Sequence, residues 1–429
     1  MPETDHPVAM QRLQPHDPFT MDWSAGAHNK VWPMRLLLHI GTAKTGTTSV
    51  QQWLYHNRDA LNACGVFPSR SLGAPNNRRI AVLGRDPDMP DDGFKQFGIN
   101  SPEDHAAFRR ETTEKFRREV AAARKNGCKT FVISSEHLHA RLISGRMVER
   151  VSELVAPEFD RVDVLCFLRP QVDLAVSRLS VSARSGSISV NRMNLEPQDP
   201  YYNYLDLWHR WTRHFDHVAF LPFKRHKDVV RTICDFLALD PERFEKPLRV
   251  NEKVDYRAAM LSAALRLPQF IAGKRNANKN AFLDEMPVEH PISISRAWAL
   301  ELQSGFVEGK RELVERCDTL RDDDLQISPE KYPEEGNFDA IFQKFEAADF
   351  ARYAIVRLNA QLWIERAGNK LATTELELVR NQPDKAQTSL KEAERFLNNA
   401  AQAEIGATDE EIAAARTKLE ALGEKLGKS

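Results

Sequence analysis

A short segment with two glycines is the part of the sequence best suited to hold a charged group. It reads HIGTAKTGTTS over residues 39–49 and lies between an apolar run and an amphipathic stretch. A loop that joins a strand to a helix directs backbone N–H groups and the positive end of the helix dipole toward one point. The segment is therefore predicted to bind a phosphate group.

The position of the lysine separates this loop from the signature of nucleotide triphosphatases. That signature, G-x-x-x-x-G-K-[ST], needs a lysine directly after its second glycine. Gly41 and Gly46 keep the spacing, but Thr47 follows the second glycine and Lys44 lies inside the loop. A neighbouring strand offers no convincing aspartate for magnesium. A lysine and hydroxyl groups around a phosphate leaving group suit sulfuryl transfer without a metal.

A second motif follows the apolar run at 162–168. The run ends at Arg169, and Ser177 lies eight positions further on, within an expected helix that also carries Asp173. An arginine at a strand end and a serine two turns into the next helix can converge on one phosphate. Taken alone, the motif also fits a surface ion pair and an ordinary helical serine.

Together and in this order, the two motifs resemble those of the PAPS-dependent sulfotransferases, and the chain is similar to their bacterial, carbohydrate-type members. The family places Lys or Arg, Ser or Thr, Gly, Thr, and Thr or Ser after its first strand, then an Arg and a Ser eight positions apart after a later one. The resemblance implies PAPS as sulfuryl donor, PAP as product and no metal. It implies in-line transfer to a hydroxyl or amine of an acceptor. A carbohydrate is expected first, ahead of a lipid, a phenol or a peptide tyrosine.

The resemblance also assigns roles to individual residues. Lys44 would stabilise the bridging oxygen, and Arg169 with Ser177 would bind the 3′-phosphate. The 5′-phosphosulfate loop would comprise Gly41, Thr42, Ala43, Lys44, Thr45, Gly46, Thr47 and Thr48. The late Arg-Lys-Gly sequence of many cytosolic members is absent. Arg249 and Lys253 lie where that sequence would be expected and could substitute for it, although they do not match the motif. The adenine contacts are not assigned.

The acceptor must lose a proton as it attacks sulfur, so a base is expected near the carboxyl end of a strand. Glu136 is the first candidate and His137 the second, because both follow the apolar run at 130–134. Glu136 equally suits a helix N-terminal carboxylate or an ion pair with an arginine. His139 lies two residues beyond His137, but two histidines without further ligands are weak grounds for a metal site.

The segment 178–194 is rich in Ser, Arg and Asn and follows the predicted 3′-phosphate helix. Such a segment can bind a sugar or an anionic acceptor, and Arg184 is the first residue to test for substrate binding. The alternative is a solvated connection. The aromatic residues Tyr201, Tyr204, Trp208 and Trp211 are interpreted as helix packing.

Short apolar runs alternate with helical patterns, which predicts a parallel sheet with right-handed crossovers. Strands are expected at 34–40, 130–134, 162–168 and 218–221, and helices at 47–61, 103–125, 146–155 and 204–215. The stretch 68–102, rich in turn residues, is expected to be a long excursion over the surface. The fold class is α/β: three layers around a central parallel sheet, P-loop-like as the resemblance implies, with a helical C-terminal extension.

Four regions are expected: a disordered leader at 1–33, the sulfotransferase domain at 34–323, a helical extension at 324–380 and a helical hairpin at 381–429. The last region carries two heptad-like apolar seams. Residues 386, 390, 393, 397 and 400 form the first, and 412, 415, 419, 422 and 426 the second. A hairpin packed on the core and an oligomerisation arm both fit these seams, so a homo-oligomer is one expectation.

Composition excludes several classes. The 429 residues carry 60 Lys and Arg against 61 Asp and Glu, which argues against a protein that coats nucleic acid. No apolar stretch is long enough to span a membrane, and the N-terminus lacks a secretory pattern. Five widely separated cysteines fit reduced thiols, so a cytoplasmic location is expected.

Two rival functions remain from the sequence. The first is a P-loop-type kinase that acts on a small molecule and requires magnesium. The second is a non-catalytic nucleotide-binding scaffold protein in which the helical arm is the functional part. Substitution of Lys44 separates this scaffold from an enzyme, because only an enzyme loses turnover.

Overall fold

The computed structural model describes residues 33–184, 187–246, 253–265, 287–343, 348–401 and 409–427. Apart from Pro33, the expected leader lies outside the described residues, as does Arg249. In the part that is described, no helix is long and apolar enough to cross a membrane.

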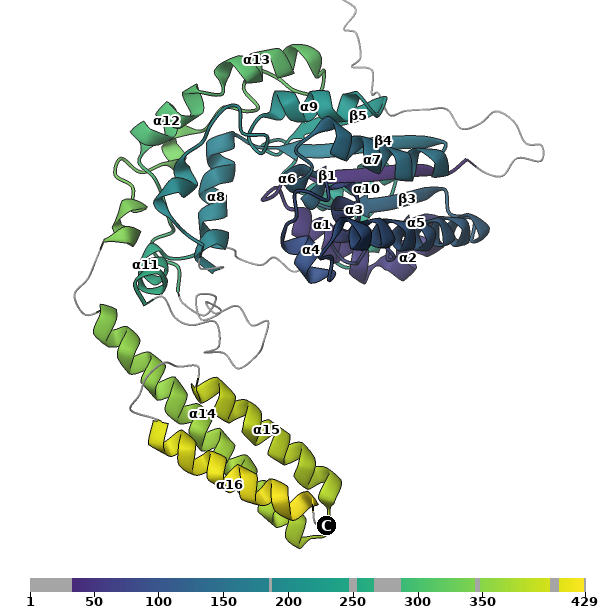
Figure 1. Ribbon diagram of the computed structural model, residues 1–429. Coiled ribbons are helices and arrows are strands. Elements are labelled where there is room, and N and C mark those ends of the chain that lie inside the picture. The colour runs from purple at the N-terminus through teal and green to yellow at the C-terminus, as the bar shows by residue number, and fades with distance from the viewer. Residues whose placement is uncertain are drawn as a thin grey trace, which may run out of the picture.

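A five-stranded parallel sheet forms the centre of the molecule (Figure 1). Its order is β2-β3-β1-β4-β5, so β1 lies in the centre of the sheet, between β3 and β4. The strands are β1 (Arg35–Gly41), β2 (Val66–Pro68), β3 (Thr130–Ser134), β4 (Arg161–Leu168) and β5 (His217–Pro222). The predicted parallel sheet is confirmed, although the three-residue β2 was not predicted because it is too short for a periodic pattern.

Alternating side chains of the strands divide the core into two layers, one on each face of the sheet. Leu36, Leu38 and Ile40 pack with α3, α5 and α7, whereas Leu37 packs with α1, α2 and α10. These helices are α1 (Thr47–His56), α2 (Arg58–Ala63), α3 (Arg78–Gly84), α5 (Pro102–Lys125), α7 (Gly145–Val155) and α10 (Val229–Leu237). The three-layer α/β class is therefore confirmed.

The expected helix at 47–61 is interrupted at Asn57, which lies between α1 and α2. The Asn57 side chain donates to the carbonyls of Trp53 (3.1 Å) and Glu245 (3.0 Å) and accepts from the N–H of Glu245 (2.8 Å). The two bonds to Glu245 are a contact distant in sequence, which sequence periodicity does not reveal.

The interpretation of 68–102 as a surface excursion is wrong. This stretch contains α3 and α4 (Asp92–Gln96), and Leu72, Ile80 and Phe94 are buried in the larger core layer. Its turn residues bound short helices whose apolar side chains cover the sheet.

Further helices follow β3 and β4 along the chain. They are α6 (His137–Arg141), α8 (Gln171–Arg184), α9 (Tyr204–Thr212), α11 (Tyr256–Leu265), α12 (Arg296–Ser304) and α13 (Val307–Arg316). Short 3₁₀ turns connect several of them, at Ala156–Glu158, Val190–Met193, Pro241–Arg243, Pro329–Lys331 and Asp339–Phe342.

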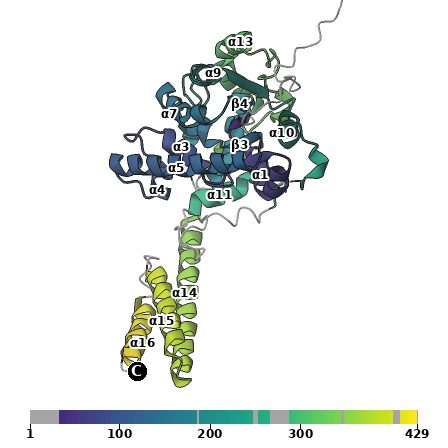
Figure 2. The ribbon, with the colours of Figure 1, turned by 90° about the vertical axis from the view of Figure 1, so that its right-hand side faces the viewer.

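Three helices at the C-terminal end pack together and extend away from the sheet (Figures 1 and 2). They are α14 (Ala348–Val379), α15 (Pro383–Ala401) and α16 (Asp409–Gly427). Both predicted seams face inward: Leu397 and Leu422, for example, are buried. Trp363 of α14 stacks on Phe396 at a ring-centroid distance of 5.4 Å, so α14 supplies a third helix to the expected pair.

Candidate functional site

The loop between β1 and α1 is held by its own threonines. The N–H and hydroxyl of Thr42 both donate to the carbonyl of Phe167 on β4, at 2.9 and 3.0 Å. The hydroxyls of Thr45 and Thr47 donate to the carbonyl of Thr42, at 2.7 and 3.0 Å. Two of the hydroxyls expected to hold a phosphate are thus committed to the loop, while Thr48 is exposed.

Both loop glycines occupy positions that other residues fit poorly. Gly41 has a φ of +113°, and a Cβ there would lie 3.3 Å from the Cα of Glu136. Gly46 has a φ of +82°, and its Cβ would lie 2.6 Å from a methyl group of Val229. At Gly41 the loop packs against the residue that follows β3, and at Gly46 it packs against α10.

The N-terminus of α1 is arranged to receive an anion. Gly46 is the N-cap and supplies no side-chain bond, and the first turn contains no acidic residue. The first N–H bonded into the helix is that of Val50, which donates to the Gly46 carbonyl at 3.2 Å. Within the described ranges, the N–H groups of residues 45–49 have no hydrogen-bond partner. These N–H groups remain available for the oxygens of a bound group.

Three cations surround this N-terminus. Burial, together with the nearby charges of Arg184 and Arg169, lowers the pKa of Lys44 to about 8. Arg169 Nη1 donates to the Lys44 carbonyl at 3.0 Å, and Asp173 is its nearest carboxylate, at 3.7 Å. The Nε of Arg169 is buried and lacks a hydrogen-bond partner in the part of the chain described. Cations crowded in this way fit an anionic ligand.

The serine of the second motif lies on the same helix as this cationic group. Ser177 follows Asp173 by one turn of α8 and is half-buried. Arg184, at the end of α8, donates to the carbonyl of Lys253 at 3.3 Å. The structure therefore brings four basic residues into one region: Lys44, Arg169, Arg184 and Lys253. The sequence alone had suggested each of them separately, from a motif or from its position in the chain.

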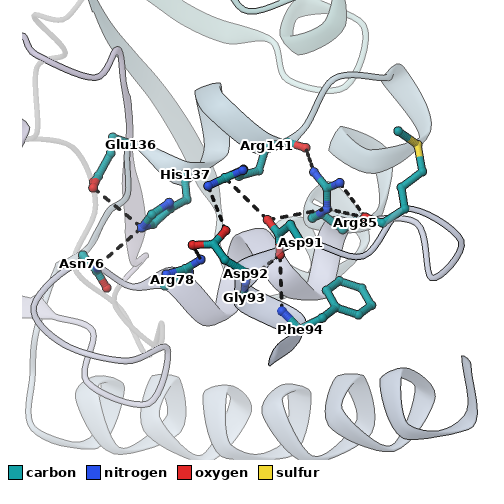
Figure 3. Close-up of polar contacts among 11 residues, drawn as sticks. Asn76, Arg78, Arg85, Asp91, Asp92, Gly93, Phe94, Glu136, His137 and Arg141 are labelled. Atoms are coloured by element: carbon teal, nitrogen blue, oxygen red, sulfur yellow. Dashed lines mark hydrogen bonds and ion pairs between the residues drawn. The ribbon is translucent and has the colours of Figure 1, made fainter. Parts of the chain in front are cut away.

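The two base candidates lie at the carboxyl end of β3 (Figure 3). One carboxylate oxygen of Glu136 accepts from Gln51 Nε2 at 2.6 Å, and the other lies 3.7 Å from His137 Nε2. Gln51 also reaches the carbonyl of Ser134, at 3.3 Å. Gln51 belongs to α1, so the helix that follows the loop after β1 also orients Glu136.

A charged network borders His137 on its other side (Figure 3). Asp92 pairs with Arg78 at 2.5 Å and with Arg141 at 2.9 Å. Burial lowers the pKa of His137, the Glu136 carboxylate opposes this shift, and Arg78 and Arg141 reinforce it. The lowered pKa favours the neutral form of the His137 imidazole.

His139 has a structural environment. It is fully buried, its Nε2 lies 3.0 Å from the carbonyl of Tyr201, and burial lowers its pKa to about 3. No group of three or more His, Cys, Asp or Glu side chains that could hold a metal occurs in the described ranges. All five cysteines are free thiols.

Sequence reasoning missed the residues that support the site. Gln51 carried a signal, because it lies one helical turn after Thr47 on the predicted helix. Tyr204, interpreted as packing, is buried and also donates its hydroxyl to the Arg169 carbonyl at 2.9 Å. Asn76, 3.5 Å from His137 Nε2, gave no signal because it lies in the stretch interpreted as surface.

Comparison with known proteins adds little to this geometry. No protein-family model matches the chain, and no curated protein matches it. A solved structure, a sulfotransferase from Alicyclobacillus acidocaldarius, aligns with 68% of this chain and 98% of its own length. The identity is 16% and the TM-score 0.38, which is too distant a likeness to carry an argument. The fold and the loop define a parallel α/β protein whose β1–loop–α1 segment has the geometry to receive an anion.

Proposed function

We propose that the protein is a PAPS-dependent sulfotransferase. The observation that carries the proposal is the convergence of Lys44, Arg169 and Arg184 at the uncapped N-terminus of α1. A doubly phosphorylated nucleotide has two separate anionic groups, and the two motifs supply two sets of partners. The near-neutral net charge of −1 is compatible with this because the cationic group is local.

The loop would bind the 5′-phosphosulfate end of the donor. The N–H groups of residues 45–49 and the exposed hydroxyl of Thr48 are suited to the phosphate oxygens. Thr45 and Thr47 would act through the shape of the loop, because their hydroxyls are bonded to Thr42. Lys44 would stabilise the negative charge that develops on the bridging oxygen as its bond to sulfur breaks.

Arg169 and Ser177 would bind the 3′-phosphate. The fork of Arg169 can bond a phosphate while Nη1 holds the Lys44 carbonyl. A cavity of about 320 Å³ lies beside Gly46 and Ser49 and is lined by Trp53 and Phe244. Its contact with the loop makes it suitable for the nucleoside part of the donor.

Glu136 is the proposed base, with His137 as the alternative. The acceptor oxygen or nitrogen would bond to sulfur while its proton passes to Glu136 and the nucleotide leaves with the bridging oxygen. Gln51 would orient the carboxylate through its 2.6 Å hydrogen bond. A carbohydrate is the proposed acceptor, and Arg184 remains a proposed substrate contact, adjacent to Lys44.

The remaining expectations stay predictions. They are the domain boundaries at 34–323, 324–380 and 381–429, the cytoplasmic location, self-association through the C-terminal helices and the absence of nucleic-acid partners. The bundle of α14, α15 and α16 is the surface to examine for self-association.

The test is transfer of label from ³⁵S-labelled PAPS to a panel of carbohydrates, phenols and lipids, with EDTA present. A sulfotransferase transfers label under these conditions, and Lys44→Ala abolishes the transfer. A small-molecule kinase would instead consume ATP and stop in EDTA. A non-catalytic nucleotide-binding scaffold would bind PAP but transfer nothing to any acceptor.

A further inference from the structure

A second cavity lies on another face of α8, outside the residues assigned to the donor. Its volume is about 220 Å³, and it is bounded by α8 and by the segment 191–202. Polar side chains dominate its wall, among them Arg178, Ser182, Asn191, Asn194 and Asp199. Hydroxyl-rich ligands need such donors and acceptors, so the chemistry of the wall is that of a polyol site.

Arg178 is a cation of this cavity that two tyrosines hold in place. It follows Ser177 directly, and its guanidinium carbon lies 4.0 Å from the centre of the Tyr201 ring. Its Nη1 donates to the Tyr202 hydroxyl at 3.1 Å, which is its one hydrogen bond within the described ranges. The tyrosines therefore fix the plane of the guanidinium and leave further N–H groups for a ligand.

Tyr201 connects this cavity to the proposed base. Its ring packs on His139 of α6 with a centroid distance of 4.7 Å, and α6 begins directly after Glu136. Burial raises the pKa of Tyr201 to about 12, and the Glu136 carboxylate is close enough to contribute to the rise. One aromatic residue thus contacts both Arg178 and the helix that begins directly after Glu136.

We propose that this cavity binds the acceptor, and that the acceptor is a hydroxyl-rich molecule carrying one carboxylate, which Arg178 binds. The inference rests on the proposed function and names the substrate class of the same site. α8 would then hold the donor through Ser177 and the acceptor through the adjacent Arg178. The two substrates would meet near Glu136.

The charged side chains that line the cavity favour a ligand with a single negative charge. Arg178 and Arg192 are cationic and Asp199 is anionic, which leaves one net positive charge. Arg192 is already bonded to Ser187, at 3.1 Å from both its carbonyl and its hydroxyl. A planar carboxylate matches the fork of Arg178, whereas Asp199 disfavours a densely charged polyanion.

The test uses calorimetry on the full-length protein saturated with PAP. The probes are tetrasaccharides that contain glucuronate and their carboxyl-reduced counterparts. We expect the glucuronate form to bind at least tenfold more tightly than the reduced form. Arg178→Gln is expected to remove this preference, and Arg118→Ala, which alters an exposed arginine of α5, is expected to retain it.

A second variant guards against a folding defect in α8. Asn194→Ala changes an exposed residue outside that helix and is expected to weaken tetrasaccharide binding several-fold, with PAP affinity unchanged. Equal binding of the two tetrasaccharides, no binding of either, or an unaltered preference in Arg178→Gln overturns the inference while leaving PAP binding intact. Wild-type protein that does not bind PAP overturns the proposed function and this inference together.

Discussion

The guanidinium of Arg169 donates a hydrogen bond to the backbone carbonyl of Lys44, with Nη1 and O separated by 3.0 Å. This bond joins the end of β4 to the loop that follows β1, so the two motifs form one site. The neighbouring strands are paired from Arg35 with Arg161 onward to Gly41 with Cys166. Their parallel register brings both carboxyl ends to one edge of the sheet.

Replacement of Arg169 by lysine tests this link. A lysine keeps the charge but cannot bond the Lys44 carbonyl and a phosphate with one planar fork. A hydrogen bond to a charged group contributes about 1.5–3 kcal/mol, so PAP affinity is expected to fall about 10- to 150-fold. Calorimetric titration measures the change, and Arg118→Lys is the matched control. An affinity equal to that of wild type would show that the guanidinium geometry is unimportant.

The pH dependence of binding tests the environment of Lys44. Its pKa in the free protein is lowered to about 8. A bound anion favours the charged lysine and raises this pKa, so binding takes up a proton above pH 8. PAP affinity is therefore expected to fall as pH rises through this range, by about tenfold per pH unit once Lys44 is mostly neutral.

Lys44→Arg distinguishes this titration from other pH effects. An arginine stays protonated at pH 9, so the decline in affinity is expected to flatten in the variant. Dissociation constants at pH 7, 8 and 9 provide the comparison, with Lys95→Arg as a control at an exposed position. Parallel curves for wild type and Lys44→Arg would assign the titration to another group.

Gly46→Ala tests the close packing of the loop. The Cβ would lie 2.6 Å from Val229 Cγ2, and the φ of +82° is unfavourable for alanine. We expect a loss of about 1–3 kcal/mol in the free energy of unfolding, together with weaker PAP binding. The double variant Gly46→Ala with Val229→Ala should regain the part due to the clash. Denaturant unfolding that shows no difference between the single variant and wild type would contradict this packing.

Paired substitutions decide between the two bases. Glu136→Gln keeps an oxygen for Gln51 but cannot accept the proton, and its turnover is expected to fall about 10²- to 10⁴-fold. PAP affinity should stay the same because Glu136 does not belong to the phosphate loop. His137→Gln is expected to have the smaller effect on turnover with labelled PAPS. The reverse order of the two losses would assign the base to His137.

The sequence was sufficient to predict four of the five strands of the sheet, all but β2. Predictions for β3 and β4 agree with the structure to within one residue at each end, because buried parallel strands are short and uniformly apolar. The interruption at Asn57 and the burial of 68–102 depend on partners distant in sequence. Local patterns contain no record of those partners.

In the candidate site, too, the sequence predicted some residues, while others depend on partners distant in sequence. The motif spacing pointed to Lys44 and Arg169, and the expected strand end pointed to Glu136; the structure places Lys44 and Arg169 in direct contact. The hydroxyls of Thr45 and Thr47 point inward to the Thr42 carbonyl instead, since a tight loop must satisfy its own polar groups. Three further residues reach this region only through tertiary packing. Gln51 lies on α1, Asn76 lies just before α3, and Tyr201 packs on His139 of α6.

The most direct test of the central claim is the preference of the protein for PAP over AMP, which lacks the 3′-phosphate. Calorimetry without added magnesium should show PAP binding about 100-fold more tightly than AMP, because only PAP carries the 3′-phosphate that Arg169 and Ser177 would bind. Arg169→Ala should remove most of that preference. Equal affinities for PAP and AMP, or no binding of PAP, would contradict the assignment of a PAPS-dependent sulfotransferase.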